Sequence, residues 1–325
     1  AEAVLWSATT GYSVSLHLPD LYSWSEATAI SGNQQVGWGN PVGPEFAHAL
    51  LWYGTAASVV DLHPAGFEDS FAYGVSDGQQ VGFGSRLRAD GFYERRALLW
   101  TGSAESVVDL TPATAPWGAE AYGVAHGQQV GVAAGHAYLW TGTAESGIDL
   151  HPTRGDLETD WSYALGTSGT QQVGYFLDDH LLENAALWSG SAESMVVLAP
   201  EDYLFSRAQA VSGGVQVGYG WKPSFGQDSR YNYLYHALLW QGSRESMVDL
   251  HAFLPSQYVM SQAYGIDELG NVVGTACTLE EFDGRPKLNY HAVMWVPVAE
   301  PMTVCLVLLG LTRPFRRSRS ARAKT

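Results

Sequence analysis

The chain has 325 residues, and its 33 Asp and Glu against 17 Lys and Arg give a formal net charge of −16. This acidic excess disfavours nucleic acid as a partner, because no basic stripe is present to displace the counterions of phosphates. Hydrophobic residues make up 46% of the chain, which excludes a disordered polymer, and the two cysteines exclude a disulfide-stapled scaffold.

A repeat begins near the start of the chain. The chain starts at Ala1 without an apolar leader, so a removed signal peptide and a trimmed sequence are both open alternatives. Residues 3–6 then give the first copy of a segment that ends in an aliphatic residue and Trp. Seven copies occur, and they end at Trp6, Trp52, Trp100, Trp140, Trp188, Trp240 and Trp295.

Three more segments recur between successive tryptophans. They read SVVDL, as in residues 58–62, AYGVS, as in residues 72–76, and QQVGxG, as in residues 79–84. Each is short, rich in β-branched and aromatic residues and bounded by turn residues, which indicates strands. Four strands in each interval of 40 to 55 residues predict an all-β fold, a β-propeller of four-stranded blades. A β-helix is the weaker alternative, because its coil is shorter.

The number of blades depends on one surplus segment. The other three segments occur six times, which favours six blades, whereas the Leu-Trp segment occurs seven times. Either residues 3–6 or residues 292–295 could complete the last blade and close the ring. In the alternative, residues 3–6 are the remnant of a seventh blade whose other strands precede Ala1. The tryptophans themselves are expected to be structural, filling the core between blades.

The residues that could carry chemistry recur with the repeat. Asp61, Asp109, Asp149 and Asp249 share one repeat position, where an Asp can bind Ca²⁺ or cap a turn. No second acid follows at a fixed spacing, so we expect turn caps, structural histidines beside them, and no cofactor or metal. No nucleophile elbow, zinc-protease motif or phosphate-binding glycine loop is present, so the sequence does not indicate an enzyme.

The connections between the QQVG and Leu-Trp strands are the least regular part of the repeat. Four are long: residues 85–95, 177–184, 221–235 and 277–290. Because they hold the same place in each repeat, we expect them on one face, and such insertions often mark a binding face. The candidate ligand contacts are Trp221, Phe225, Arg230, Tyr231, Tyr233 and Tyr235. In the alternative, these aromatic side chains fold back over a blade edge.

The segments taken together resemble a bacterial extracellular repeat family named HAF after its His-Ala-Phe-x-Trp strand. Residues 48–52, 136–140, 236–240 and 291–295 carry the match, with Leu, Tyr or Val in place of Phe. The resemblance covers nearly all of residues 1–296. It implies a secreted repeat protein and brings no established activity with it.

The last part of the chain differs from the repeats. Residues 301–325 carry six Lys and Arg and no acid, so residues 1–300 have a net charge of −22. Glu300 and Pro301 precede an apolar run at residues 302–311, and Arg316 and Arg317 follow it. This order resembles a PEP-CTERM sorting signal, with Ala299 in place of its first Pro. The resemblance implies a processing enzyme of the exosortase type and transient contact with a membrane.

These observations predict two parts, a propeller at residues 1–297 and a sorting tail at residues 298–325. We expect a protein secreted by, or held on the outer surface of, a Gram-negative-type bacterium. It would serve there as a binding or structural module, with extracellular polysaccharide or a surface protein as partner. The alternative is an extracellular carbohydrate-active enzyme, a hydrolase or lyase, with its active site on the propeller axis.

Overall fold

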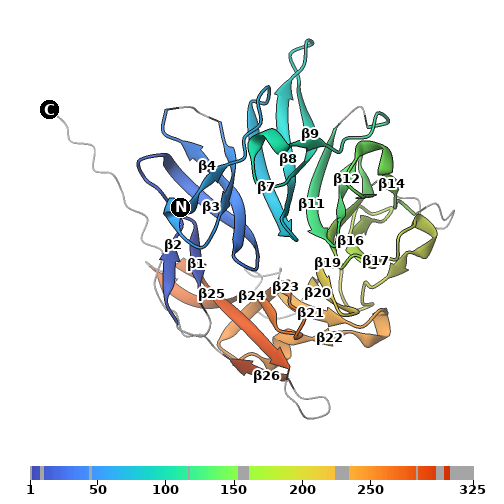
Figure 1. Ribbon diagram of the computed structural model, residues 1–325. Helices are drawn as coiled ribbons and strands as arrows, with labels where there is room; N and C mark the ends of the chain where they lie inside the picture. The colour runs from blue at the N-terminus through green and yellow to red at the C-terminus, as the bar shows by residue number, and fades with distance from the viewer. Residues whose placement is uncertain are drawn as a thin grey trace.

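The computed structural model describes residues 2–7, 11–43, 46–115, 118–152, 161–223, 234–282, 285–297 and 304–307. In these residues the chain is an all-β propeller of six four-stranded antiparallel blades. The blades follow one another around the ring in chain order (Figure 1), so the predicted fold class and the count of six blades are confirmed.

Each blade takes its strands from one stretch of chain, and we number the blades one to six in chain order. In blades one to five the AYGVS segment and its variants form the first strand, QQVG the second, Leu-Trp the third and the middle of SVVDL the fourth. Blade one consists of β3 (Tyr22–Ser31), β4 (Gln34–Pro41), β5 (His48–Trp52) and β6 (Val60–Asp61), and blade two of β7 (Asp69–Ser76), β8 (Gln79–Leu87), β9 (Tyr93–Trp100) and β10 (Val108–Asp109). Blade three consists of β11 (Ala119–Ala125), β12 (Gln128–Ala133), β13 (His136–Trp140) and β14 (Ile148–Asp149), and blade four of β15 (Ser162–Thr167), β16 (Gln172–Leu177), β17 (Glu183–Trp188) and β18 (Val196–Val197). Blade five consists of β19 (Phe205–Ser212), β20 (Val215–Lys222), β21 (Leu234–Trp240) and β22 (Val248–Asp249), and blade six of β23 (Tyr258–Ile266), β24 (Val272–Phe282), β25 (Arg285–Pro297) and β26 (Val304–Val307).

A close approach between the first two strands explains the glycine of the QQVG segment. In blade two Gly82 pairs with Ala72, where the register then shifts by a bulge. A Cβ atom at Gly82 would lie 1.8 Å from the carbonyl oxygen of Phe71, so a larger residue would force the two strands apart. The same contact recurs at 2.0 Å or less at Gly37, Gly131, Gly174, Gly218 and Gly274.

The tryptophan of each third strand fills the core between its own blade and the preceding one. Six of the seven repeat tryptophans are at most 1% exposed: Trp52, Trp100, Trp140, Trp188, Trp240 and Trp295. Trp100 of blade two packs with Val36, Ala49 and Leu51 of blade one. The tryptophan therefore recurs because each blade needs a large ring to bury the apolar face of its neighbour.

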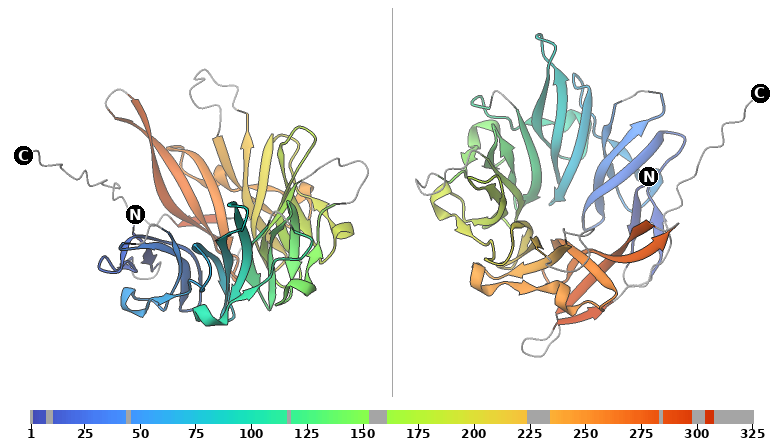
Figure 2. Two further views of the ribbon diagram at one scale, coloured as in Figure 1. Left: turned by 90° about the horizontal axis from the view of Figure 1, so that it is seen from above. Right: turned by 180° about the vertical axis from the view of Figure 1, so that it is seen from behind.

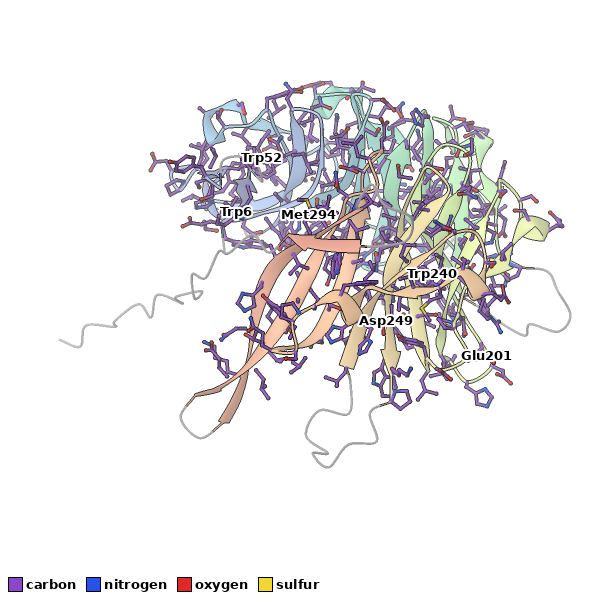
Figure 3. The ribbon with its side chains drawn as sticks, turned by 90° about the horizontal axis from the view of Figure 1, so that it is seen from below. Trp6, Trp52, Glu201, Trp240, Asp249 and Met294 are labelled. Atoms are coloured by element: carbon purple, nitrogen blue, oxygen red, sulfur yellow. The ribbon has the colours of Figure 1, made fainter. Side chains whose placement is uncertain are left out.

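The N-terminal strands form a separate two-stranded sheet between blades one and six (Figure 1). Among the described strands, β1 (Val4–Trp6) pairs only with β2 (Ser13–Ser15). Ala3 and Leu16, which flank these two strands, pack with Trp52, so the sheet covers part of blade one. Figure 3 labels Trp6, Trp52 and Met294, which mark this sheet, blade one and blade six. The surplus Leu-Trp segment is thus β1, while residues 292–295 belong to β25, the third strand of blade six.

The described part of the C-terminal segment is strand β26. It pairs antiparallel with β25 and forms the fourth strand of blade six. The remaining residues of 298–325 lie outside the described part of the chain, including Glu300, Pro301, Arg316 and Arg317. In the described ranges, no helix has the length and apolar character that crossing a membrane requires.

Candidate functional site

The two ends of the ring differ, because antiparallel strands place like connections at the same end. One end carries the turns between first and second strands and the 3-10 turns between third and fourth strands; we call it the turn face. The other end carries the hairpins between second and third strands and the links to the next blade; we call it the loop face. All four long connections leave and re-enter their blades at the loop face.

The turn face is built from one repeated set of hydrogen bonds. The Gln80 side chain accepts a hydrogen bond from the Gly102 backbone N–H at 2.8 Å, and the Ser106 hydroxyl accepts one from Thr101 at 2.8 Å. The glutamine contact recurs for Gln35, Gln129, Gln172 and Gln216. The second Gln of QQVG and the Ser that opens SVVDL are therefore structural.

On the loop face a hydrogen-bonded chain joins blade one to blade two. His48 Nδ1 lies 2.7 Å from Asp61 Oδ2, and Asp61 Oδ1 accepts from the His63 backbone N–H at 2.8 Å. His63 Nδ1 lies 2.9 Å from Ser70 Oγ, which also accepts from the Ala49 backbone N–H at 2.9 Å. Equivalent sets occur after blades three and five, at His136, Asp149, His151 and Ser162 and at His236, Asp249, His251 and Ser261.

This arrangement suits a structural role better than metal binding. The rings of His48 and His63 stack with centroids 4.0 Å apart and planes 7° apart, so their in-plane lone pairs cannot converge on one ion. Burial, reinforced by the neighbouring imidazole, lowers the pKa of His63 and brings that of His251 to about 4. The Asp61 carboxylate is engaged by a ring and a backbone N–H, as expected for a turn cap.

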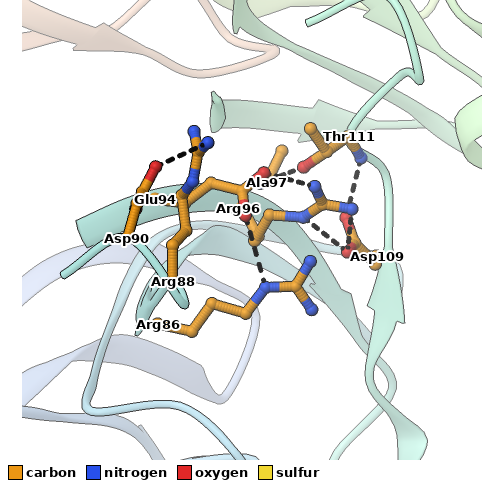
Figure 4. A network of polar contacts seen from close by, with 8 residues as sticks. All are labelled: Arg86, Arg88, Asp90, Glu94, Arg96, Ala97, Asp109 and Thr111. Carbon is orange, nitrogen blue, oxygen red and sulfur yellow. Dashed lines mark hydrogen bonds and ion pairs between the residues drawn. The ribbon is translucent and has the colours of Figure 1, made fainter. Parts of the chain in front are cut away.

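Blade two fills the same positions with different residues (Figure 4). Arg96 binds Asp109 at 2.8 Å and Glu94 at 2.7 Å, and the Thr111 hydroxyl takes the place of the serine by accepting from Ala97 at 3.0 Å. Arg96 thus stands where blade one has His48, and a guanidinium or an imidazole can fill this position because either group binds the Asp that caps the turn. This substitution argues against a conserved chemical step at these histidines.

Two charged pairs of opposite polarity join neighbouring blades. Arg95 of blade two binds Glu120 of blade three, whereas Glu183 of blade four binds Arg207 of blade five. The Tyr122 hydroxyl donates to Glu120 at 3.1 Å, and burial raises the pKa of Tyr122 far above its usual value. Both carboxylates are therefore held by guanidinium groups, which suits blade packing better than proton transfer.

Four exposed aromatic side chains lie on the loop face, on three different blades. Phe92 is 71% exposed and Tyr290 is 63% exposed, and Tyr93 and Trp161 are also exposed. They come from the hairpins of blades two and six and from the start of blade four. Three of these four residues lie in long connections that the sequence predicts for the loop face, at residues 85–95 and 277–290. The densest group of aromatic residues in the sequence lies instead at residues 221–235, which is why the predicted contacts were placed there.

The predicted contact residues are only partly described. Trp221 lies in β20 opposite Phe205 and Tyr235, and it is half-buried. Tyr235 packs its ring 5.9 Å from Phe205 and 5.6 Å from Tyr219, so part of it belongs to the blade. Phe225, Arg230, Tyr231 and Tyr233 lie outside the described residues.

One acidic cluster also lies on the loop face, in the hairpin of blade four. The ligand atoms of Asp178, Asp179 and His180 lie within 4.8 Å of one another. Asp178 accepts from the backbone of His180 at 3.0 Å and of Leu182 at 2.9 Å, and Asp179 lies 2.6 Å from the His180 ring. These contacts fold the tip of the hairpin.

Comparison with known proteins supports the fold alone. No family model matches the chain, and no curated protein matches it in sequence. Among solved structures it is similar to a puromycin hydrolase mutant complexed with PGG, with a TM-score of 0.56 and 11% identity over 95% of this chain and 50% of that one. It is also similar to a prolyl endopeptidase, with a TM-score of 0.54 and 12% identity over 91% of this chain and 46% of that one. The chain therefore spans about half the length of these two enzymes.

Proposed function

We propose that this protein is an extracellular binding module whose loop face contacts a polysaccharide. The observation that carries this proposal is the set of exposed aromatic side chains on that face: Phe92, Tyr93, Trp161 and Tyr290. An aromatic ring offers a flat apolar surface on which the C–H face of a sugar ring packs. Because the rings belong to three different blades, they suit a long polymer better than a small ligand.

The negative charge of the protein indicates which polysaccharides it would bind. Residues 1–300 carry a net charge of −22, and the loop face also presents Asp178 and Asp179. A negative surface repels an anionic chain over the range set by ionic screening. The proposed ligand is therefore a neutral polysaccharide.

The enzymatic alternative has less support. Cleavage of a glycosidic bond by general acid and base needs two carboxyl groups roughly 5–9.5 Å apart that are available to the substrate. Two carboxylates at blade interfaces, Glu120 and Glu183, are each bound by an arginine. The similarity to two hydrolases extends to the fold and supplies no catalytic residue.

The resemblance of the C-terminal segment to a sorting signal supports a location at the cell surface. We propose that Glu300 and Pro301 mark the processing site, with Arg316 and Arg317 on the cytoplasmic side of the membrane. Mature protein would then lack the residues after about Pro301, including β26 of blade six. Mass spectrometry of secreted material tests this, and an intact C-terminus would contradict it.

Binding is tested with the full chain on an array of neutral and anionic polysaccharides. The double variant Phe92→Ala with Tyr93→Ala removes two exposed rings from the tip of a hairpin, so we expect the fold to remain and the affinity to fall about tenfold or more. The matched control is Tyr53→Ala, an exposed tyrosine on the turn face, which should leave the affinity unchanged. Equal affinity in all three proteins, or no binding to any polysaccharide, would overturn the proposal.

A further inference from the structure

The first strands of the blades lie nearest the centre of the ring, as views from its two sides show (Figure 1 and Figure 2). Each carries an alanine between two residues that differ from blade to blade. The alanine is fully buried in blades two to six, at Ala72, Ala121, Ala164, Ala208 and Ala263. Its two neighbours are half-buried or exposed in every blade. Packing between blades therefore fixes the alanine and leaves the chemistry of its neighbours open.

In blades two to four these neighbours bring phenol rings together. The rings of Tyr73 in blade two and Tyr122 in blade three have centroids 5.8 Å apart. Tyr163 of blade four stacks on Tyr175, with centroids 4.8 Å apart. Burial and the charge of Glu120 raise the pKa of Tyr122, and Tyr163 adds to the rise, so the phenols of blades three and four lie near each other.

Two ion pairs flank the phenol of blade four. Arg95 binds Glu120 on one side of it, and Arg207 binds Glu183 on the other. Burial raises the pKa of Tyr163, and the charges of Glu120 and Glu183 raise it further, so this phenol lies close to both pairs. The two guanidinium groups balance the two carboxylates, and the set has no net charge. We call these residues the axial wall: Arg95, Glu120, Tyr122, Tyr163, Glu183 and Arg207.

The axial wall offers hydrogen-bonding groups beside flat rings. The side chain of Arg95 is 57% exposed and that of Arg207 is 30% exposed, so both guanidinium groups remain partly accessible. The hydroxyl of Tyr163 makes no hydrogen bond to another described residue. Sugar hydroxyls donate to carboxylates and accept from guanidinium groups, and the C–H face of a sugar packs on an aromatic ring. Because the charges of the wall cancel, it suits a neutral sugar.

The wall continues from the exposed rings of the loop face. Tyr93 and Arg95 are two residues apart in β9, so their side chains leave the same face of that strand. The carbonyl oxygen of Trp161 accepts from the Leu177 backbone N–H at 2.9 Å, which extends the pairing of β15, so Trp161 and Tyr163 likewise share a face. A chain lying on Tyr93 or Trp161 therefore has its next contacts at the axial wall.

We propose that the axial wall binds the terminal sugar unit of a neutral saccharide chain. The class of ligand rests on the proposed function, and the wall adds a second contact site to the loop face. A terminal unit fits because the wall faces the inside of the ring, which a polymer lying across the loop face enters with an end.

The test is calorimetry of the full chain with short neutral probes: maltotriose, cellotriose, mannotriose and tri-N-acetylchitotriose. We expect at least one of them to bind one to one. Arg95→Met removes the guanidinium, which lies 4.9 Å from the centre of the Phe83 ring, and keeps an unbranched stem there, so the affinity should fall about tenfold. Tyr163→Phe removes only a hydroxyl, so the fold should remain and the affinity should fall about fivefold.

Two matched variants control for the loss of an arginine or a phenol elsewhere. Arg88→Met removes an arginine from the same hairpin of blade two, where it binds Asp90 at 2.9 Å. Tyr138→Phe removes the hydroxyl of a half-buried tyrosine on the third strand of blade three. Both should leave the affinity for the trisaccharide unchanged.

The outcomes separate the axial wall from the loop face. If a polysaccharide binds but no trisaccharide does, or if trisaccharide affinity ignores both Arg95→Met and Tyr163→Phe, the axial site is wrong and the loop-face proposal stands. Equal losses in the two control variants would overturn the axial site as well. If a trisaccharide binds and both wall variants weaken it, the axial site stands even where Phe92→Ala with Tyr93→Ala leaves polysaccharide binding unchanged. Absence of binding by every trisaccharide and every polysaccharide would overturn both.

Discussion

At the scale of single residues, the loop-face histidines couple folding to pH. Burial and the neighbouring His236 lower the pKa of His251 from 6.5 to about 4. Between these values the unfolded chain binds a proton that the folded chain does not, so stability is complete above pH 6.5 and is lost as the pH falls toward 4. Burial would raise the pKa of Asp249, but hydrogen bonds from His236, from Tyr203 and from the His251 backbone outweigh it and lower that pKa. The contribution of Asp249 to stability is therefore lost only at more acidic pH.

The prediction is that His251→Gln reduces the loss of stability between about pH 7 and pH 4.5, because it removes one group that must take up a proton on unfolding. The midpoint of urea unfolding at the two pH values measures this loss. His180→Gln is the control, since His180 is exposed on a hairpin tip. An identical pH dependence in the wild-type chain and both variants would contradict the argument.

At the scale of the element, the third strand of a blade stabilises the ring through its tryptophan. Trp100→Ala should lower the free energy of unfolding by about 3–5 kcal/mol, because it leaves a cavity between blades one and two. Trp6→Ala changes the same repeat position in β1, where the side chain is 51% exposed, and should cost less than about 1 kcal/mol. Urea unfolding of the two variants gives the difference, and similar losses would show that β1 packs like a complete blade.

The strands of the blades could be predicted from the sequence wherever close packing allows few residue types at a repeat position. A Cβ atom at Gly82 would lie 1.8 Å from a backbone oxygen, and Trp100 fills the core between two blades, so the spacing of these two residue types revealed the blades. The sequence could not predict whether the first Leu-Trp segment belongs to a four-stranded blade. Strands β1 and β25 share a sequence pattern, and they differ in the strands that pair with them. The exposed rings on the loop face were missed for a related reason. Phe92 satisfies no packing constraint that repeats, so no period marks it.

At the scale of the whole molecule, the free energy of local unfolding should decline from the middle blades toward blade one and blade six. A repeat array is stabilised mainly by contacts between neighbouring units. Blades two to five have a blade on each side. Among the described residues, β3 packs on its other side against the small sheet of β1 and β2, and Val273, on the face of blade six away from blade five, is 48% exposed. Blades one and six therefore bury less apolar surface per residue than the other blades, and they can open locally at a lower free energy.

Hydrogen exchange of the full chain measures this gradient. We expect the backbone amides of β11 and β12 to exchange only through global unfolding, and those of β23 and β24 to exchange through a local opening that breaks blade six alone. Both pairs contain a bulge beside a close glycine contact, at Gly131 and at Gly274, whereas only the blade of β11 and β12 has a described blade on each side. Equal protection in both pairs would mean that blade six is stabilised by contacts beyond those of the described residues.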